Sequence, residues 1–324
     1  MNVYDFDKTI YNGDSTTHFY FYCLKKQPRI LLRLPYQAWV FFCYIIGYYD
    51  KTQFKERFYS FFKSVKNIDE LVNDFWESHM HNIKKWYIDT QNESDIVISA
   101  SPEFLLSPIC ARLGIKHLIA SRVDRFTGKY DGLNCYGEEK VVRLHGEFGE
   151  VEIENFYSDS LSDTPLANLA KNESYIVCVD KLTKWSEYKV SAPKKFIKML
   201  FDREFLSFAF IGVINTLNSV IFSYIYSLYF DPNLAFAAGY VSSLIISYIL
   251  NSYITFKEKM EFGKFIKFAA SYIPNFIIQN LIVFIVYNLL SFSELIAYIL
   301  AALIGVPVTF IMMKIFVFKG KKRS

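Results

Sequence analysis

Val3-Tyr4-Asp5-Phe6-Asp7-Lys8-Thr9-Ile10 is the stretch that decides the fold. A short apolar strand runs directly into two carboxylates, Asp5 and Asp7. We expect the chain to leave the strand at Asp5, so that both carboxyl groups converge at the carboxyl end of the strand. That is where an open α/β sheet binds its ligands. Such a pair suits a nucleophile and a proton donor gathered around a divalent cation.

A second strand is predicted in the β-branched segment 95–99, which ends in Ser99 and precedes a helix near Pro102. The free N–H groups of a helix N-terminus favour phosphate, and Ser99 is placed to donate its hydroxyl to a phosphate oxygen. The alternative is that Ser99 is simply the N-cap of that helix.

Two later segments contain further polar partners. Lys140 follows Gly137 at the start of a helix and could reach a phosphoryl group and Asp5, although a single lysine is more often a solvated surface residue. A further strand ends in Asp159, and Asp163 follows at the start of the next helix. Carboxylate oxygens with water and phosphate are the ligands that Mg²⁺ prefers, so Asp159 could complete a magnesium site with Asp5.

The order Asp-x-Asp-x-Thr, Ser, Lys, Asp-x-x-x-Asp closely resembles the motif set of the haloacid dehalogenase superfamily of phosphatases. The helical insert between the first two motifs resembles the cap of its phosphoserine-phosphatase-like branch. The resemblance implies an α/β Rossmann-like domain over residues 1–180, with a helical cap at about 14–92. Many members have glycine at the position of Lys8, which adds a positive charge here.

The resemblance also implies a role for each motif residue. Asp5 attacks phosphorus, and Asp7 protonates the leaving alcohol and later activates water. Thr9 and Ser99 bind phosphate oxygens, and Lys140 neutralises charge and orients Asp5. The implied cofactor is Mg²⁺, and the implied metal residues are Asp5, Asp7, Asp159 and Asp163.

An unusual apolar segment lies within the predicted cap at residues 30–49, with Arg33 as its one charged residue. It has the length of a membrane span, but Pro35 and Gly47 disfavour one. Three interpretations stay open: a hairpin that contacts the membrane interface, a buried helix and a true span. A true span would separate Asp5 from the later motifs, which the site chemistry forbids.

The charges of the chain divide it into two parts. Residues 1–204 carry 27 Lys/Arg and 28 Asp/Glu, whereas residues 205–324 carry nine and four. The basic segment 181–204 suits a juxtamembrane linker on anionic lipid. The five scattered cysteines indicate reduced thiols, and no signal peptide precedes Asp5, so we expect this domain in the cytoplasm.

Four apolar runs follow, each long enough to cross a bilayer: about 205–229, 234–256, 265–290 and 295–318. Seven Lys/Arg lie in the linker, three in the loop 257–264 and four in the tail 319–323, and none lies in the two intervening loops. This bias predicts a multi-pass protein of the cell membrane with both termini and the first domain on the cytoplasmic side.

An internal repeat relates these runs. Phe205, Phe208 and Asn215 match Phe265, Phe268 and Asn275 at an offset of 60, and the segment 247–256 matches 309–318 at an offset of 62. Two helices per unit predict two parallel repeats. The pattern resembles the GtrA-like family over residues 205–320, which is associated with moving polyprenyl-phosphate-linked sugars. Met313, Pro274 and Pro307 depart from it, and we expect the two prolines to interrupt helices.

Polar amides inside the spans are costly unless they pair or line a pathway. Both interpretations stay open for these residues, which we take as candidate lipid or pathway sites: Asn215, Asn218, Asn251, Asn275, Gln279 and Asn280.

The leading hypothesis is a membrane-bound, Mg²⁺-dependent phosphatase of a lipid-linked phosphate. A polyprenyl-phosphate sugar phosphate is favoured over phosphatidylglycerophosphate as the substrate. The alternative is a lipid-linked sugar flippase or membrane scaffold with the phosphatase domain as an accessory. We expect no nucleic-acid partner, and the membrane domain could form a homo-oligomer.

Overall fold

The structure is a computed structural model that describes residues 1–318. It divides into two compact units, the first made of residues 1–42 and 49–189, the second of residues 43–48 and the chain from 190 onward. The basic tail at 319–323, which contributed to the predicted orientation, lies outside the described residues.

The first unit is built on a six-stranded sheet in the order β3-β2-β1-β4-β5-β6. The first five strands are parallel, and β6 runs antiparallel to β5. Their bounds are β1 Val3–Tyr4, β2 Ile96–Pro102, β3 His117–Ser121, β4 Ile153–Ser158, β5 Ala170–Cys178 and β6 Lys181–Lys184.

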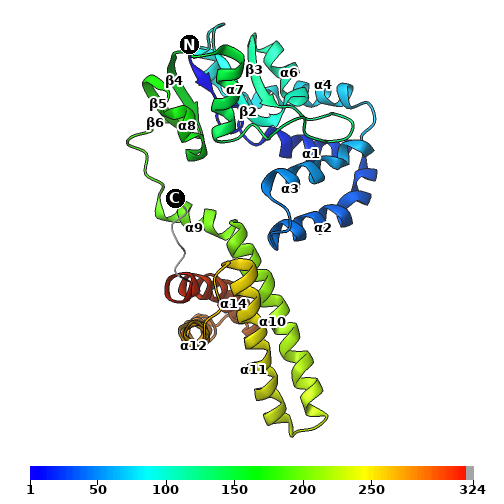
Figure 1. Ribbon diagram of the computed structural model, residues 1–324, viewed down its shortest axis with the longest axis vertical. Helices are drawn as coiled ribbons and strands as arrows, with labels where there is room; N and C mark the ends of the chain where they lie inside the picture. Colours follow the sequence, from blue (N-terminus) through cyan, green and yellow to red (C-terminus); the bar gives the residue numbers. More distant parts are fainter. Residues whose placement is uncertain (319–324) are drawn as a thin grey trace. The chain divides into compact units, whose positions relative to one another are not determined.

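Both faces of the sheet are covered by helices, as a parallel sheet requires. Alternate residues of one strand point to opposite faces, so Val3 and Ile96 join one apolar cluster whereas Tyr4 and Val97 join another. Helices α7 and α8 pack on the first face (Figure 1). The helices of this unit are α1 Ser15–Lys26, α2 Leu34–Ile45, α3 Lys51–Tyr59, α4 Ile68–His79, α5 Lys85–Thr90, α6 Glu103–Arg112, α7 Glu138–Phe148 and α8 Thr164–Ala167.

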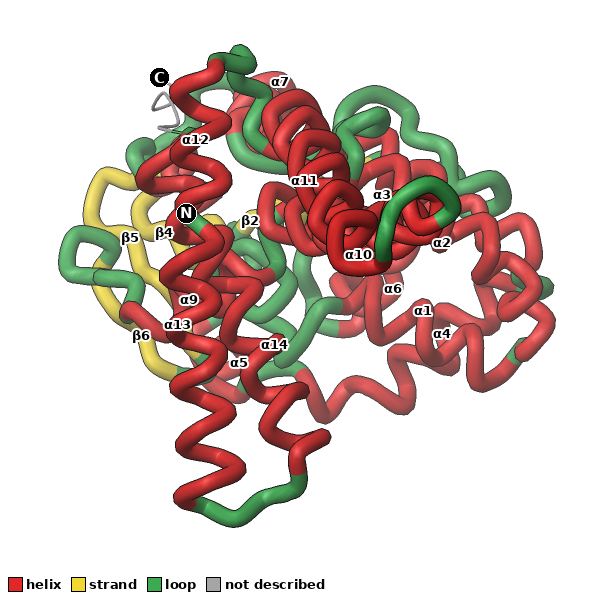
Figure 2. The backbone as a smooth tube through the Cα atoms, turned by 90° about the horizontal axis from the view of Figure 1, so that it is seen from below, coloured by secondary structure: helices red, strands yellow, loops and turns green. Residues whose placement is uncertain are grey.

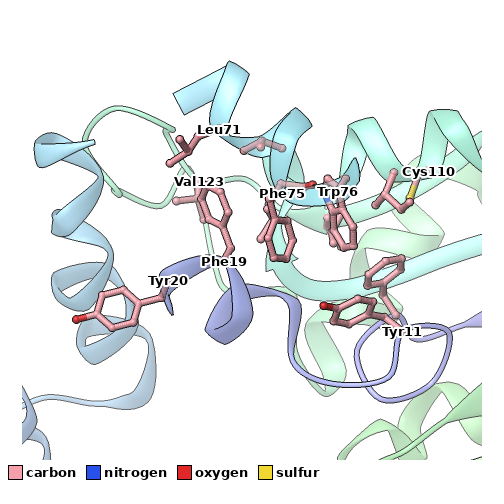
Figure 3. Packing of buried hydrophobic residues seen from close by; sticks show 14 of the residues in the cluster. Tyr11, Phe19, Tyr20, Leu71, Phe75, Trp76, Cys110 and Val123 are labelled. Atoms are coloured by element: carbon pink, nitrogen blue, oxygen red, sulfur yellow. Dashed lines mark hydrogen bonds between the residues drawn. The ribbon is translucent and has the colours of Figure 1, made fainter. Parts of the chain in front are cut away.

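The helical insert shares its core with the sheet. Figure 3 shows Phe19 of α1 and Phe75 and Trp76 of α4 packed with Tyr11 and with Cys110 of α6. The insert between β1 and β2 consists of helices and turns, as the sequence predicts. Because it contributes directly to the main core, the insert stabilises the loop that carries Asp5 and Asp7.

The apolar segment 30–49 begins within a six-residue 3₁₀ helix at Pro28–Arg33 and continues directly into α2. Helix α2 has 12 residues, about 18 Å, which is too short to cross a bilayer. Among the described residues, the helical segments long and apolar enough to cross a membrane do not include segment 30–49, which argues against the true-span interpretation. Pro35 lies in the first turn of α2, where the backbone N–H that proline lacks would have no partner within the helix. Leu32 is 83% and Trp39 58% exposed, so the segment is not a buried helix throughout.

The second unit contains four helical segments that are long and apolar enough to cross a membrane. They span Arg203–Ser227, Pro232–Thr255, Phe262–Leu289 and Ile299–Val317. Helix α10 packs against α11 and α13 packs against α14 (Figure 2). The helices are α9 Ala192–Leu200, α10 Arg203–Ser227, α11 Pro232–Leu250, α12 Phe262–Ala270, α13 Tyr272–Val283 and α14 Glu294–Met312.

The structure supports the internal repeat at two places. The helical backbone widens into π-type turns at Asn251–Thr255 and at Met313–Val317, which are 62 residues apart. The repeat-related aromatic residues also converge, because Phe208, Phe268, Phe318 and their neighbours form one buried cluster. Phe256 stacks on Phe318, its repeat equivalent, at 4.3 Å between ring centroids.

Four sequence predictions need correction here. Helix α14 continues through Pro307, and the helix break falls at Ser271, before Pro274. Strand β2 extends beyond Ser99 to Pro102 with an irregular register after Ile98. Strand β6, with the sequence Lys-Leu-Thr-Lys, lies inside the segment assigned to the linker. Its single apolar residue, Leu182, gives no alternating pattern, and the strand is defined by its pairing with β5. Because β6 belongs to the sheet of the first unit, this unit ends at Lys189 and not at residue 180.

Replacement of Trp76 tests the contribution of the core that the helical insert shares with the sheet. The Trp76 side chain is fully buried and its indole N–H donates to the carbonyl of Leu105 at 2.6 Å. Trp76→Ala removes this volume and the hydrogen bond, so we expect a loss of about 3–5 kcal/mol in the free energy of unfolding. Thermal unfolding of the purified chain in detergent measures it. The matched control is Trp39→Ala, and an equal loss there would contradict the assignment, since Trp39 is largely exposed.

Candidate active site

The predicted motif residues of the first unit, except Thr9, line one cavity of about 490 Å³. It lies at the carboxyl ends of the central strands, because Asp5 directly follows β1 and Asp159 directly follows β4. Parallel neighbours β1, β2 and β4 end at the same edge, so residues far apart in sequence meet there. The lining includes Asp5, Asp7, Ser99, Lys140, Asp159 and Asp163.

Asp5 is held by a buried ion pair. Lys140 Nζ donates to Asp5 Oδ1 at 2.7 Å and to Asp163 Oδ2 at 2.9 Å. Ser158 Oγ donates to the same Asp163 oxygen at 2.7 Å. The Lys140 side chain is only 2% exposed, so the interpretation of Lys140 as a solvated surface residue is wrong.

The electrostatics of Asp5 are set by burial and by its neighbours. Burial raises the pKa of Asp5, Lys140 opposes this rise, and the charges of Asp163 and Asp159 add to it. The pKa of Lys140 lies above its ordinary value, because the two carboxylates outweigh the burial that lowers it. Lys140 is therefore the fixed positive charge of the site.

Asp7 is bound by hydrogen-bond donors and not by a cation. The backbone N–H of Ser15, at the start of α1, donates to Asp7 Oδ1 at 2.6 Å, and Ser101 Oγ donates to Oδ2 at 2.5 Å. The pKa of Asp7 is raised to about 6, because burial and the charge of Asp14 outweigh the opposing hydrogen bonds from Ser101 and Ser15. A carboxyl group with a pKa near neutrality is suited to give and take a proton.

Two hydroxyl groups lie close to these carboxylates. Thr9 is fully buried, and its Oγ1 has no hydrogen-bond partner among the described residues. Ser99 Oγ accepts the backbone N–H of Ser101 at 3.1 Å and is also buried. Ser99 lies inside β2, four residues before α6, so it is not the N-cap of that helix. Ser99 lines the cavity, whereas Thr9 is not among its lining residues, so the phosphate-binding role of Thr9 stays a prediction.

The donor chemistry fits a hard divalent cation. Asp163 Oδ1 is buried without a partner in the part of the chain described, and burial together with Asp163 raises the pKa of Asp159. Unpaired carboxylate oxygens of this kind suit Mg²⁺, which needs only one or two of them with water and phosphate. No three acid, histidine or cysteine side chains among residues 1–318 are grouped tightly enough to hold a metal alone. Asp5, Asp7, Asp159 and Asp163 all line the cavity, and they stay the residues predicted to hold the ion.

Lys8 adopts a backbone conformation that glycine favours. Its φ is 58°, in the left-handed region, which accounts for the preference for glycine at this motif position. The carbonyl of Lys8 accepts Lys84 Nζ at 2.6 Å, and this bond stabilises the turn. The charge of Lys8 lowers the pKa of Asp159, so the side chain also acts on the site.

Three groups of site residues were not predicted from the sequence. Ser101 and Ser15 bind Asp7, Ser158 binds Asp163, and Lys51 and Lys55 of α3 line the cavity. One signal could have revealed Ser101, since residues two apart on a strand share a face and Ser99 was already a candidate. The others depend on contacts between elements that no local pattern contains.

The candidate residues of the membrane spans do not form one site. Asn275 and Gln279 of α13 meet at Gly305 of α14, where an added Cβ would lie 2.7 Å from Asn275 Oδ1 and 2.2 Å from Gln279 Nε2. Gln279 and Asn280 line a hollow of about 290 Å³. Asn251 donates to the Ser247 carbonyl in its own helix. The Oδ1 atoms of Asn215 and Asn251 are buried without a partner among the described residues, and Asn218 of α10 is half-buried.

Lys140→Met tests the buried ion pair. The variant leaves Asp5 and Asp163 buried without their cation, so we expect a loss of about 3–5 kcal/mol in the free energy of unfolding. The loss is larger at pH 8 than at pH 5, because the Asp5 carboxyl, whose pKa burial raises, takes up a proton at the lower pH. Thermal unfolding at both pH values measures this. Lys171→Met, which removes an exposed pair with Glu152, is the control; equal losses in both variants would refute the assignment.

Comparisons with known proteins agree with this geometry. A family model described as haloacid dehalogenase-like hydrolase matches residues 3–168, and one described as GtrA/DPMS, transmembrane domain matches residues 207–318. Protein CicA of Caulobacter vibrioides is 34% identical over 86 residues, which are 25% of this chain and 39% of that protein. A histidinol-phosphatase of Neisseria meningitidis is 29% identical over 115 residues, 31% of this chain and 52% of that protein. The chain thus spans no more than about half the length of these two relatives.

A solved structure of a protein of unknown function from Bordetella pertussis covers 52% of this chain and 85% of its own, with 21% identity and a TM-score of 0.43. The first family model matches more than half of the chain, which establishes the family and confirms the predicted resemblance to haloacid dehalogenase phosphatases. The second model confirms the predicted GtrA-like resemblance of the membrane domain. The chain belongs to the haloacid dehalogenase-like hydrolases and carries, after that domain, a GtrA/DPMS-type transmembrane domain.

Proposed function

We propose that this membrane protein is a Mg²⁺-dependent phosphatase that removes a terminal phosphate from a lipid-linked substrate. One observation carries the proposal: a buried Asp5–Lys140 pair with Asp7 beside it lines a cavity in a chain that also contains four membrane-spanning helices. A polyprenyl-phosphate sugar phosphate is the favoured substrate, and phosphatidylglycerophosphate is the alternative. The names of the relatives, among them a histidinol-phosphatase, agree with phosphate-ester hydrolysis.

Each residue of the site has its own role in the proposed reaction. The Asp5 carboxylate attacks phosphorus and forms an aspartyl phosphate, while protonated Asp7 gives its proton to the leaving alcohol. Asp7 then takes a proton from water, whose oxygen attacks phosphorus and releases Asp5 and inorganic phosphate. Lys140, Thr9 and Ser99 stabilise the charge on the phosphoryl oxygens. A bound Mg²⁺ would supply further neutralisation of that charge.

Surface features near the ends of the membrane domain support a lipid substrate. Helix α9 carries Lys194, Lys195 and Lys198 together with exposed Phe196 and Ile197. A short helix that combines basic and apolar side chains in this way suits a membrane interface with anionic lipid.

The apolar segment 30–49 supports the same conclusion. It exposes Leu32, Trp39 and Tyr48 to 83%, 58% and 73%. The interfacial interpretation of this segment remains part of the proposal, as does the cytoplasmic position of the termini and of the hydrolase domain. The basic residues of the linker and of the loop 257–264 favour that orientation.

Phosphate release from two short-chain lipids tests the function. The purified chain is assayed with dihexanoyl phosphatidylglycerophosphate and with a geranyl-phosphate-linked hexose 6-phosphate, with Mg²⁺ or after chelation. We expect hydrolysis of the hexose derivative above all, its loss on chelation, and a loss of about 10³-fold or more in Asp5→Asn, which lacks the nucleophile. Activity confined to soluble esters would refute the lipid substrate.

The Asp5→Asn variant also distinguishes the enzyme hypothesis from the flippase or scaffold hypothesis. The unpartnered amide oxygens of the spans, such as Asn215 Oδ1, are the feature that favours transport. Asp5→Asn keeps the membrane domain intact, whereas deletion of residues 205–324 removes it. If lipid turnover in cells were unchanged in Asp5→Asn and lost in the deletion, the enzyme proposal would fail.

Ser101→Ala tests the role of Asp7. The Ser101 hydroxyl lowers the pKa of Asp7, which is about 6, so its removal raises that pKa. Asp7 must be protonated to act as the acid, and activity therefore falls as pH rises through its pKa. We expect the alkaline limb of the pH–kcat/KM profile to move to higher pH in Ser101→Ala. Ser107→Ala, which removes an exposed hydroxyl on α6, is the control; a limb that stays in place in both variants would show that Asp7 is not the acid.

A further inference from the structure

Two lysines of the helical insert line the cavity that contains Asp5 and Asp7. Lys51 and Lys55 lie four residues apart on α3, so they share one face of the helix. Phe54 and Phe58 of the same helix line the cavity as well. One helix therefore adds two positive charges and two aromatic rings to the space above the motif residues.

The charges of these lysines are not neutralised by carboxylates. In the part of the chain that the structure describes, Lys140 forms ion pairs with Asp5 and Asp163, but neither Lys51 nor Lys55 forms one. Lys55 Nζ approaches Asn134 Oδ1 at 3.5 Å, the limit of a hydrogen bond. Lys51 Nζ lies 3.8 Å from the centre of the Tyr136 ring. Both cations are thus held by neutral groups.

The environment of Lys55 disfavours its charge. The pKa of Lys55 is lowered to about 8, first by burial and then by the neighbouring Lys51, and the charges of Asp14 and Asp7 oppose this only in part. A cation placed in a low-dielectric site without a counter-ion is costly. An anion that entered the cavity beside Lys55 would remove this cost.

We propose that Lys51 and Lys55 form a second anion subsite, which binds a phosphodiester or diphosphate group of the substrate while the terminal phosphate lies at Asp5. This inference rests on the proposed function and narrows its substrate class to molecules with two phosphate groups. Phe54 and Phe58 contact the apolar part of the substrate next to the second phosphate. Both lipids considered above carry such a group, whereas simple phosphate monoesters do not.

A matched pair of soluble esters tests the subsite without a lipid. Propyl phosphate has one phosphate, and propane-1,3-diol bisphosphate has the same carbon chain with two. We expect Lys55→Met to raise KM for the bisphosphate about tenfold more than KM for propyl phosphate, the effect of one lost charge-assisted hydrogen bond. Lys51→Met shifts KM in the same direction, and Lys55→Arg restores the wild-type preference because it keeps the charge.

The control variant is Lys63→Met, an exposed lysine in the turn that follows α3 and outside the cavity lining. It should change neither KM. Equal KM changes for the two soluble esters in Lys55→Met, or no change for the bisphosphate, would overturn the subsite. The thermal midpoint of each variant shows that the fold is retained.

Two further measurements identify the natural source of the second phosphate and separate this inference from the proposed function. The same variants are assayed with dihexanoyl phosphatidylglycerophosphate and with the geranyl-phosphate-linked hexose phosphate. The physiological class is the lipid that the wild-type protein hydrolyses with the higher kcat/KM, and its KM should rise in Lys55→Met. If the wild-type protein hydrolysed the two soluble esters but neither lipid, the proposed lipid substrate would be refuted. The KM values of Lys55→Met for the two soluble esters would still show whether the second anion subsite exists. If the wild-type protein hydrolysed nothing, calorimetric binding of the bisphosphate to Asp5→Asn and to Asp5→Asn/Lys55→Met would decide whether the subsite exists.

Discussion

The ion pair between Lys140 and the carboxylates of Asp5 and Asp163 is the interaction on which the hydrolase domain depends. Its charges lie out of water, where they are stable only if each is paired and hydrogen-bonded. Lys140 meets this condition with two carboxylates, and Ser158 donates to one of them. The partners come from the end of β1, the start of α7 and the turn before α8. The sheet order must be correct for the charges to be neutralised, so the fold and the site stabilise each other.

The two aspartates of the first motif are adjacent in the site but lie in different environments. Asp5 faces a cation and further carboxylates, whereas Asp7 accepts hydrogen bonds from Ser101 and from the first residue of α1. A carboxylate oriented by a lysine is suited to nucleophilic attack, and a buried carboxyl group with a raised pKa is suited to proton transfer. The division of roles therefore follows from the surroundings of two chemically identical side chains.

The membrane domain relies on a different kind of packing. In lipid, burial of apolar surface between helices adds little, so close contacts and aromatic packing matter more. Gly239 allows α11 to approach α10, since a Cβ there would lie 2.3 Å from Ser223 Oγ. Repeat-related phenylalanines such as Phe256 and Phe318 meet in one buried cluster. The repeat visible in the sequence thus corresponds to a shared contact and not only to similar helices.

The sequence by itself determined the family, the four spans, the helical insert and the motif residues, because these depend on local patterns: strand ends with polar residues, apolar runs and a repeated motif. Only the tertiary structure decided that Lys140, 135 residues from Asp5, is a buried counter-ion and that Ser101 binds Asp7. The same holds for strand β6, which exists only through pairing with β5, and for Lys55, whose position over the cavity depends on the packing of α3. Burial and long-range pairing arise from the arrangement of distant elements, and no window of sequence contains that information.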